Sequence, residues 1–442
     1  MQELIDRYNS ALAKTERMSH RDLRHYQEAL LIRLLRHARD NLSFYRSRLD
    51  ALFRGNGDVD LSRWNEIPIL RRDEVSLHGP KMRVPQLPTS YGEIHYFQTS
   101  GSTGAPLDIA SNALVLVASN ALLTRMARWF GLDTSRPLAT IRLFANDPAR
   151  PGPEGRVSNG WSFANPTAPF YEIELMTPIE QQLEWLSRHK TPYLATQPSG
   201  ALAIAHAVTP ERGKALGIEI VILFGETIPD GARDFIYERL GARVAAIYSC
   251  QEIGTIACEC EAMPHYHVAA ENAFVEIVDE NGHEVAPGEL GRVVVTGLYN
   301  YAMPFIRYDL GDLAWAGMAT CMCGRALPVI TRIEGRIRNA FVFRDGARVW
   351  PRGAMVRPMH AFVPFQRYQL VQLDHERIEF RYIADGSGRK PDVAGLNAYA
   401  RTVLHPSIQM SVCEMEVFPP GPSGKVVEFI SHILDSAPRG PT

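Results

Sequence analysis

Two stretches in the N-terminal part of the chain have the hydrophobic spacing of helices. Between residues 21 and 49 apolar side chains recur at intervals of three and four, which predicts an amphipathic helix that ends near Asn41. The positions that define it are Leu30, Leu31, Leu34, Leu35 and Ala38. A polar, glycine-containing loop follows at residues 54–60, and a second helix is expected over residues 112–130.

The middle of the chain alternates between short apolar runs and helix-like segments. Residues 138–143 and 218–224 are apolar runs of strand length, which favours buried strands. Residues 179–187 and 230–240 have the spacing of amphipathic helices. Because strands that alternate with helices are typical of βαβ units, the pattern predicts a layered α/β architecture with largely parallel strands.

The pattern becomes richer in β-structure toward the C-terminus. Residues 273–278 and 292–296 flank a polar segment with glycines, which predicts an antiparallel, hairpin-rich subregion. Beyond Arg336, short strands with glycine-rich breaks indicate a small α+β domain. The strands expected there are residues 340–343, 368–373, 377–383 and 415–418. We therefore expect a large N-terminal domain over residues 1–336 and a small C-terminal domain over residues 337–442.

Composition narrows the class of protein. Of the 442 residues, 45% are hydrophobic and 22% are charged, which is the balance of a globular protein with a full core. The net charge of -2 gives no electrostatic reason to expect nucleic acid or an anionic membrane as a partner. No apolar run approaches the ~20 residues that span a bilayer, and the N-terminus lacks the apolar core of a signal peptide. We therefore expect a cytoplasmic protein.

A loop of small hydroxyl residues and glycines is the first candidate for chemistry. Its sequence is Thr99-Ser100-Gly101-Ser102-Thr103-Gly104. Glycines let the backbone approach a phosphate and turn N–H groups toward it, and hydroxyls add side-chain donors. The loop is not of the Walker type, because no Lys-Ser/Thr pair follows the last glycine. An ordinary solvated linker is the alternative interpretation.

The loop and five later segments resemble the motifs of the adenylate-forming superfamily, the acyl-CoA synthetases and their relatives. Residues 99–106, TSGSTGAP, are similar to its phosphate loop. The later segments, in the same order as in the family, are Gly225-Glu226-Thr227, Tyr248-Ser249-Cys250-Gln251-Glu252, Arg307-Tyr308-Asp309-Leu310-Gly311-Asp312, Gly335-Arg336 and Pro422-Ser423-Gly424-Lys425. Two N-terminal segments, HARDNLSFYRSRL and WNEIPILRRDEV, resemble the phenylacetate–CoA ligase branch. The resemblance extends from about residue 25 to residue 430.

The resemblance implies a role for each motif. The phosphate loop would hold the β- and γ-phosphates of ATP, residues 225–227 would contact the adenine, and Tyr248 and Ser249 would line the adenylate. Glu252 would hold Mg²⁺, a cation that prefers oxygen ligands. Asp312 would accept from the ribose hydroxyls, with Arg336 close by. Lys425, on a mobile C-terminal lid domain, would stabilise charge on the carboxylate and the α-phosphate.

The resemblance also implies a two-step reaction. A small-molecule carboxylic acid is activated as its acyl-adenylate with release of pyrophosphate, and the acyl group then passes to coenzyme A or to the phosphopantetheine of a carrier protein. The local candidates for the acid pocket are aromatic and apolar, which favours an aryl or arylacetic acid. They are Trp161, Phe163, Phe224 and Ile247.

Several positions depart from the family pattern. Leu107 and Asp108 occupy the region where a lysine often follows the phosphate loop. Ser249 and Gln251 replace a glycine and a hydroxyl residue, and Arg338 replaces the hinge aspartate or lysine. These departures leave two alternatives: an adenylate-forming amide synthase or carrier-loading enzyme, and a zinc-stapled nucleotide-binding protein that has lost catalysis.

Cysteines and histidines form a second candidate site. Four of the 6 cysteines form two C-x-C pairs, and an H-x-H pair lies between them, which favours metal ligands in a cytosolic protein. Buried thiols with incidental histidines are the alternative. Relatives in the phenylacetate branch carry a structural zinc with a similar E-C, H and C-x-C-G-R pattern. The resemblance implies zinc bound by Cys260, His267, Cys321 and Cys323, with Cys258 and His265 in reserve.

Overall fold

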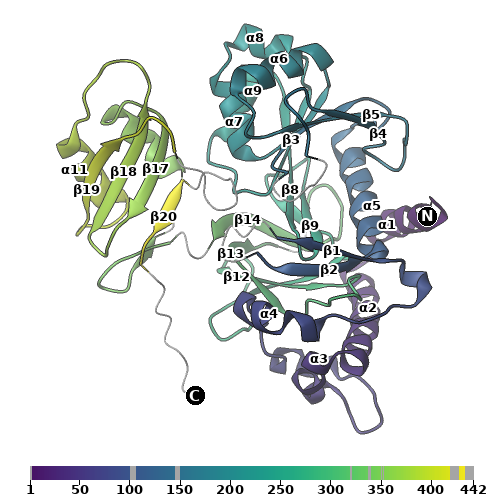
Figure 1. Ribbon diagram of the computed structural model, residues 1–442. Coiled ribbons are helices and arrows are strands. Elements are labelled where there is room, and N and C mark those ends of the chain that lie inside the picture. The colour runs from purple at the N-terminus through teal and green to yellow at the C-terminus, as the bar shows by residue number, and fades with distance from the viewer. Residues whose placement is uncertain are drawn as a thin grey trace. The chain divides into compact units, whose positions relative to one another are not determined.

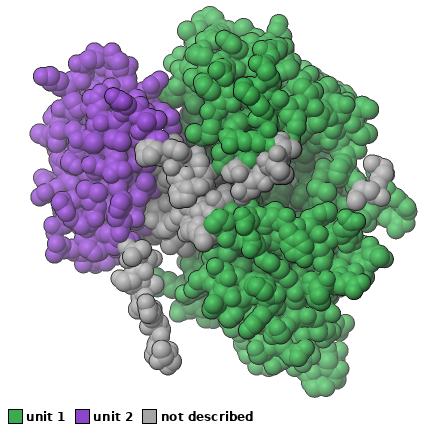
Figure 2. All heavy atoms as spheres, viewed as in Figure 1, with its two compact units in different colours: residues 1–227, 235–333 green, residues 228–234, 334–442 purple. Residues whose placement is uncertain are grey.

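The chain folds into two compact units, each with its own apolar core. The computed structural model describes residues 2–99, 106–144, 150–318, 321–336, 340–349, 351, 353–418 and 428–433. The large unit comprises residues 1–227 and 235–333, and the small unit comprises residues 228–234 and 334–442 (Figure 2). The assignment of an adenylation domain to residues 1–336 and of a lid to residues 337–442 stays a prediction.

Nine α-helices are described before residue 241. The first long one, α2, begins after Ser19, whose side chain accepts a hydrogen bond from the backbone N–H of Asp22, and it ends at Asn41 as the hydrophobic spacing predicted. None of the described helices is long and apolar enough to cross a bilayer. The helices are α1 (Gln2–Thr15), α2 (His20–Asn41), α3 (Ser43–Arg48), α4 (Arg72–His78), α5 (Ala113–Phe130), α6 (Ile179–His189), α7 (Pro198–His206), α8 (Pro210–Ala215) and α9 (Ala232–Leu240).

A twelve-stranded mixed sheet crosses the large unit in the order β11-β12-β13-β14-β10-β9-β8-β7-β6-β3-β5-β4. The neighbours from β8 to β5 pair in parallel, and β8–β9, β9–β10 and β11–β12–β13 pair antiparallel. The predicted α/β class and the hairpin near residue 273 are therefore confirmed. The strands are β3 (Leu138–Arg142), β4 (Arg156–Asn159), β5 (Pro169–Glu174), β6 (Tyr193–Thr196), β7 (Ile220–Phe224), β8 (Arg243–Cys250), β9 (Gly254–Glu259), β10 (Tyr266–Val268), β11 (Ala273–Val278), β12 (Leu290–Gly297), β13 (Tyr308–Ala316) and β14 (Val329–Arg336).

Helices pack on the parallel strands, and a separate hairpin precedes α5. Met126 and Phe130 of α5 share a core with Leu138 and Ile222 of the strands. Figure 1 shows α6, α7, α8 and α9 grouped beside the parallel strands, away from α5. The hairpin pairs β1 (Ile94–Gln98) with β2 (Asp108–Asn112), and its loop is the predicted phosphate loop. Both ends of this loop are thus fixed by strand pairing.

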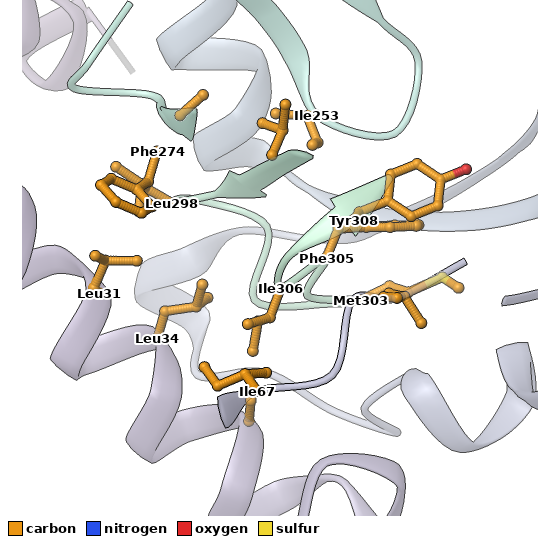
Figure 3. Packing of buried hydrophobic residues seen from close by; sticks show 14 of the residues in the cluster. Leu31, Leu34, Ile67, Ile253, Phe274, Leu298, Met303, Phe305, Ile306 and Tyr308 are labelled. Atoms are coloured by element: carbon orange, nitrogen blue, oxygen red, sulfur yellow. The ribbon is translucent and has the colours of Figure 1, made fainter. Parts of the chain in front are cut away.

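The core of the antiparallel half draws on segments that are distant in sequence. Figure 3 shows Leu31 and Leu34 of α2, Ile67 before α4, and Ile306 and Tyr308 around the start of β13 within the same cluster. Each of these side chains is at most 2% exposed. Burial of large apolar side chains contributes roughly 1.5–3 kcal/mol each, so this cluster fixes the N-terminal segment on the sheet.

One charged side chain crosses this apolar region. Arg307 is 1% exposed, and its Nη2 lies 2.9 Å from Oε1 of Glu276 in β11. The guanidinium also donates to the backbone carbonyls of Asn65, Ile67 and Gly282 at 3.2, 2.9 and 2.7 Å. It therefore joins three segments, with its charge paired and its donors satisfied.

The small unit is an α+β structure built on a four-stranded sheet of order β19-β18-β17-β20. Its elements are β15 (Phe341–Val342), β16 (Arg348–Val349), α10 (Gly353–Val356), β17 (Phe365–Gln372), β18 (Arg377–Ala384), α11 (Val393–Val403), β19 (Gln409–Glu414) and β20 (Phe429–Ser431). The predicted strand at residues 415–418 is wrong. The strand ends at Glu414, and Val417 is 69% exposed, because the sheet accepts the more polar residues 409–414 beside β18.

We predict that Arg307→Ala lowers the free energy of unfolding of the large unit by about 3–5 kcal/mol, because it leaves the buried Glu276 without a partner. Urea denaturation followed by tryptophan fluorescence measures the change. Arg188→Ala is the control: Arg188 pairs with Glu154 at the surface, and we expect a change of at most about 0.5 kcal/mol. A loss below about 1 kcal/mol for Arg307→Ala would contradict the role given to Arg307.

Candidate active site

The segment that resembles an adenine-contacting motif lies at the carboxyl end of β7. Oε2 of Glu226 accepts a hydrogen bond of 3.0 Å from the backbone N–H of Ser199, the second residue of α7. Helix α7 follows β6, which is the neighbour of β7 in the sheet. Residues 225–227 are therefore anchored at the carboxyl ends of two adjacent parallel strands, where open α/β sheets bind their ligands.

Two residues predicted for the ATP site are in direct contact. The hydroxyl of Tyr248 in β8 donates a hydrogen bond of 2.7 Å to Oδ2 of Asp312 in β13. Asp312 is 7% exposed, and the pairing of β8 with β9 shifts register between Tyr248 and Ser249. The tyrosine thereby fixes the orientation of a carboxylate that comes from the antiparallel half of the sheet.

Glu252 lies in the turn between β8 and β9 and is 9% exposed. The hydroxyl of Tyr308 donates to Oε1 of Glu252 at 3.2 Å, and Nη1 of Arg72 lies 3.6 Å from the same oxygen. Burial raises the pKa of Tyr308, so its hydroxyl remains a donor. Gly254 has a φ of +89°, and a Cβ there would lie 2.9 Å from Oγ of Ser119, so glycine lets this turn pack on α5.

Thr99 closes the base of the predicted phosphate loop. Its backbone N–H donates to the carbonyl of Leu107 at 2.9 Å, and its Oγ1 accepts from the N–H of Leu107 at 2.9 Å. Nη2 of Arg72 donates to the same hydroxyl oxygen at 3.2 Å. The other predicted loop residues, Ser100, Gly101, Ser102, Thr103 and Gly104, lie outside the described residues.

Arg72 is a site residue that sequence reasoning missed. It is the first residue of α4, two residues after Leu70, which bridges to Tyr308 of β13. Its guanidinium contacts both Thr99 and Glu252. The segment WNEIPILRRDEV carried only a family resemblance, and nothing in its spacing indicates a partner at Glu252. Structurally, Arg72 places a cation between the phosphate loop and the carboxylate expected to hold Mg²⁺.

The four predicted acid-pocket residues do not come together. Phe224, at the carboxyl end of β7, pairs in register with Ile247 of β8, and both are partly exposed although their strands are central in the sheet. Trp161 instead donates from Nε1 to the carbonyl of Arg136 at 2.8 Å, at the amino ends of the parallel strands. Phe163 lies in the same turn as Trp161. Trp161 is a core residue, and we retain only Phe224 and Ile247 for the pocket.

Two further predicted residues are not placed at this site. Arg336 is the last residue of β14 and belongs to the small unit. Lys425 lies outside the described residues. Their roles stay predictions from family resemblance.

The cysteine–histidine group is brought together by β9, β10 and the loop after residue 320. The ligand atoms of Cys260, His265, His267 and Cys321 all lie within 4.8 Å of one another. The Sγ atoms of Cys260 and Cys321 are 3.8 Å apart, and Sγ of Cys323 is 3.2 Å from Nε2 of His267. Cys258, one of the two reserve ligands, instead lies in the hydrophobic core that contains Met126.

The chemistry of this group suits a zinc ion. Two sulfurs bound at about 2.3 Å in tetrahedral geometry lie about 3.8 Å apart, as do those of Cys260 and Cys321. Burial lowers the pKa of His267 to about 4, which keeps its ring neutral as a metal ligand must be. Burial raises the pKa of Cys260 to about 12, so a cation is needed to hold it as thiolate at neutral pH. Nε2 of His265 is buried with no hydrogen-bond partner among the described residues.

The chain resembles known ligases in sequence and in fold. No protein-family model matches it. A phenylacetate–coenzyme A ligase of Thermus thermophilus is 27% identical over 363 residues, which cover 76% of this chain and 75% of the relative. A phenylacetate–coenzyme A ligase of Pseudomonas putida is 25% identical over 350 residues, which cover 74% of each. The crystal structure of 2-hydroxyisobutyryl-CoA ligase in the postadenylation state superposes with a TM-score of 0.73 at 18% identity, covering 95% of this chain and 91% of that one.

The α/β architecture with a large mixed sheet and a small C-terminal sheet is thus that of solved adenylating ligases. In sequence and in fold the chain is similar to members of the adenylate-forming superfamily. The sequence comparisons support an enzyme of the AMP-forming acid–thiol ligase class.

Proposed function

We propose that the chain activates an aryl or arylacetic acid as its acyl-adenylate, with release of pyrophosphate, and transfers the acyl group to the thiol of coenzyme A. The observation that supports this proposal best is the meeting of Arg72, Thr99 and Glu252 beside the Tyr248–Asp312 pair. A cation, a phosphate-loop hydroxyl and two nearly buried carboxylates are the groups that a nucleotide and its metal ion require.

In adenylation the carboxylate of the acid attacks the α-phosphate of ATP, and both groups are anions. The site must therefore neutralise charge and hold the attacking oxygen in line. The lysine that often follows the phosphate loop is absent here, and Leu107 and Asp108 occupy its region. In our proposal Arg72 replaces part of that charge, directed at the terminal phosphates through its place beside Thr99. Glu252 would hold Mg²⁺, which when bound neutralises phosphate oxygens.

Tyr248 and Asp312 would serve the nucleoside. The hydrogen bond of 2.7 Å from Tyr248 orients the carboxylate of Asp312, which would accept from a ribose hydroxyl. Residues 225–227 would present backbone groups to the adenine at the end of β7. The aryl part of the acid would lie against Phe224 and Ile247. Lys425 would complete the site by stabilising charge at the α-phosphate.

We also propose that the cysteine–histidine group holds a structural zinc ion. A closed set of four protein ligands leaves no open position for a substrate, so the ion would connect β9, β10 and the loop of Cys321 rather than take part in the reaction. The second ring nitrogen of His267, Nδ1, lies 3.4 Å from the carbonyl oxygen of Leu327, a contact that would orient the ring toward the ion.

ATP–pyrophosphate exchange over a panel of aryl, amino-aryl and aliphatic acids tests the proposed activation. We expect exchange with at least one aryl acid, and a decrease of at least about a hundredfold in Lys425→Ala, since charge stabilisation of this kind contributes several kcal/mol. An unchanged circular-dichroism spectrum controls for folding. Coenzyme A, a phosphopantetheinylated carrier protein and amines, supplied to the preformed adenylate, separate the proposed thiol transfer from amide synthesis. Absence of exchange with every acid would contradict adenylation.

Arg72→Ala should reduce kcat/KM for ATP in the same assay about ten- to a hundredfold, because a charge-assisted hydrogen bond contributes about 1.5–3 kcal/mol. Arg71→Ala is the matched control: its side chain is exposed one residue away, and we expect a change below about twofold. Equal effects of the two variants would remove Arg72 from the site.

Metal analysis of protein purified without chelator should find about one equivalent of zinc. His267→Ala and Cys260→Ser should abolish retention, because each removes a ligand. The control variants Cys258→Ser and Cys413→Ser should retain the ion, because these two cysteines lie outside the group. Single variants of His265 and Cys323 identify the fourth ligand. Zinc below about 0.2 equivalents in the wild-type protein would refute this proposal.

A further inference from the structure

Side-chain oxygens without a hydrogen-bond partner gather at the carboxyl ends of β5, β6 and β7. Among the described residues, five buried carboxylate or amide oxygens lack a partner, and four of them lie here. These four belong to Glu174 at the end of β5, Gln182, Gln197 directly after β6, and Glu226 after β7. Nε2 of Gln182 donates to the carbonyl of Leu175, which places Gln182 at the end of β5. Buried acceptors are normally paired, so these four oxygens are the acceptors that a ligand's donor groups could satisfy.

Of these four residues, Gln197 lies beside Phe224 and Ile247, the two residues that we keep for the acid pocket. Thr196 pairs in register with Ile141 of β3 and with Leu223 of β7, so the next residue, Gln197, lies between Arg142 and Phe224. Its φ of -72° and ψ of 151° continue the extended strand, which places its side chain on the same face as those of Ala195 and Phe224. Phe224 and Ala195 are both partly exposed on this face. On the face of the sheet where we expect the aryl ring, the side chain that follows Ala195 along β6 is therefore the amide of Gln197.

The backbone around Gln197 is held firmly. A Cβ on Gly200 would lie 2.6 Å from Oγ1 of Thr196, so glycine allows the close approach of α7 to the end of β6. The N–H of Ser199 is bonded to Glu226. Gln197 is 4% exposed, and its side chain does not cap the helix that follows it. Among the described residues nothing donates to its Oε1, which leaves this buried oxygen for a donor on a ligand.

We infer that the acid activated by this enzyme is an aryl acid with a hydroxyl or amino substituent, and that Gln197 accepts a hydrogen bond from that substituent. The inference rests on the proposed function for the reaction itself. An unsubstituted ring would leave the amide oxygen unpaired next to Phe224, whereas a hydroxyl or amino group satisfies it. Sites that bond a substrate hydroxyl or amino group discriminate strongly against analogues without that group. Gln197 is thus a specificity residue that touches the non-reacting end of the acid.

The test compares phenylacetate with its ring-hydroxylated and ring-aminated forms in wild-type enzyme, Gln197→Leu and Gln197→Asn. For each acid, kcat/KM is measured by ATP–pyrophosphate exchange, and the dissociation constant is measured by calorimetry. We expect the wild-type enzyme to prefer a substituted acid at least tenfold. Gln197→Leu, which removes the acceptor while keeping the side-chain size, should lose that preference, so that the three acids give kcat/KM values within about threefold of one another. Gln197→Asn, which keeps an amide, should retain part of the preference.

The outcomes separate this inference from the proposed function. Exchange at similar rates with all three acids, or an unchanged preference in Gln197→Leu, would overturn the role of Gln197 and leave adenylation in place. Binding that favours a substituted acid and loses this preference in Gln197→Leu, without any exchange, would support the role of Gln197 and contradict adenylation. A preference lost equally in Gln197→Asn and Gln197→Leu, together with a lowered melting temperature in both, would assign Gln197 to packing and overturn the inference.

Discussion

The buried guanidinium of Arg307 is the interaction on which the candidate site depends. The backbone φ of Arg307 is 49°, in the left-handed region. This conformation costs a non-glycine residue of order 1 kcal/mol or more, so surrounding contacts must hold Arg307 there. Those contacts tie the carbonyls of Asn65 and Ile67 to the strand that carries Glu276. With the segment before α4 fixed in this way, Leu70 exchanges backbone hydrogen bonds with the start of β13, and Arg72 reaches Glu252.

Sequence patterns predicted the parts of the fold that local spacing controls. Examples are the end of α2 at Asn41 and the strand that begins at Ala273. In both, the spacing of apolar residues along the chain is enough to identify the element. The pairing of Arg72 with Glu252 could not be read in this way, because 180 positions separate the two residues. Long-range contacts bring them together, among them those of Arg307 and the bridge between Leu70 and Tyr308. The strand expected at residues 415–418 failed for a related reason: partners in the sheet, not local hydrophobicity, select which residues pair with β18.

The candidate site was predictable as a set of motifs but not as a geometry. Motif order gave Tyr248 and Asp312 separately, whereas their hydrogen bond requires β8 of the parallel half and β13 of the antiparallel half to meet in space. The acid pocket shows the opposite case. Trp161 and Phe224 are both aromatic and close to site motifs in sequence, yet parallel strands put them at opposite ends. Aromatic character alone cannot distinguish the two ends of a strand.

The metal group is connected to the ATP site through β9 and α5. Strand β9 has Glu252 two residues before it and Cys260 directly after it, so an ion that joins Cys260 to His267 of β10 would fix the far end of the strand that supports Glu252. Trp129 of α5 contacts His267, at a centroid distance of 5.8 Å, and Arg325 stacks on it at 4.1 Å. Since α5 directly follows the hairpin that closes the phosphate loop, a structural ion would restrain both elements that position the nucleotide. It would do so from outside the reaction, which is consistent with a ligand set that leaves no coordination position open.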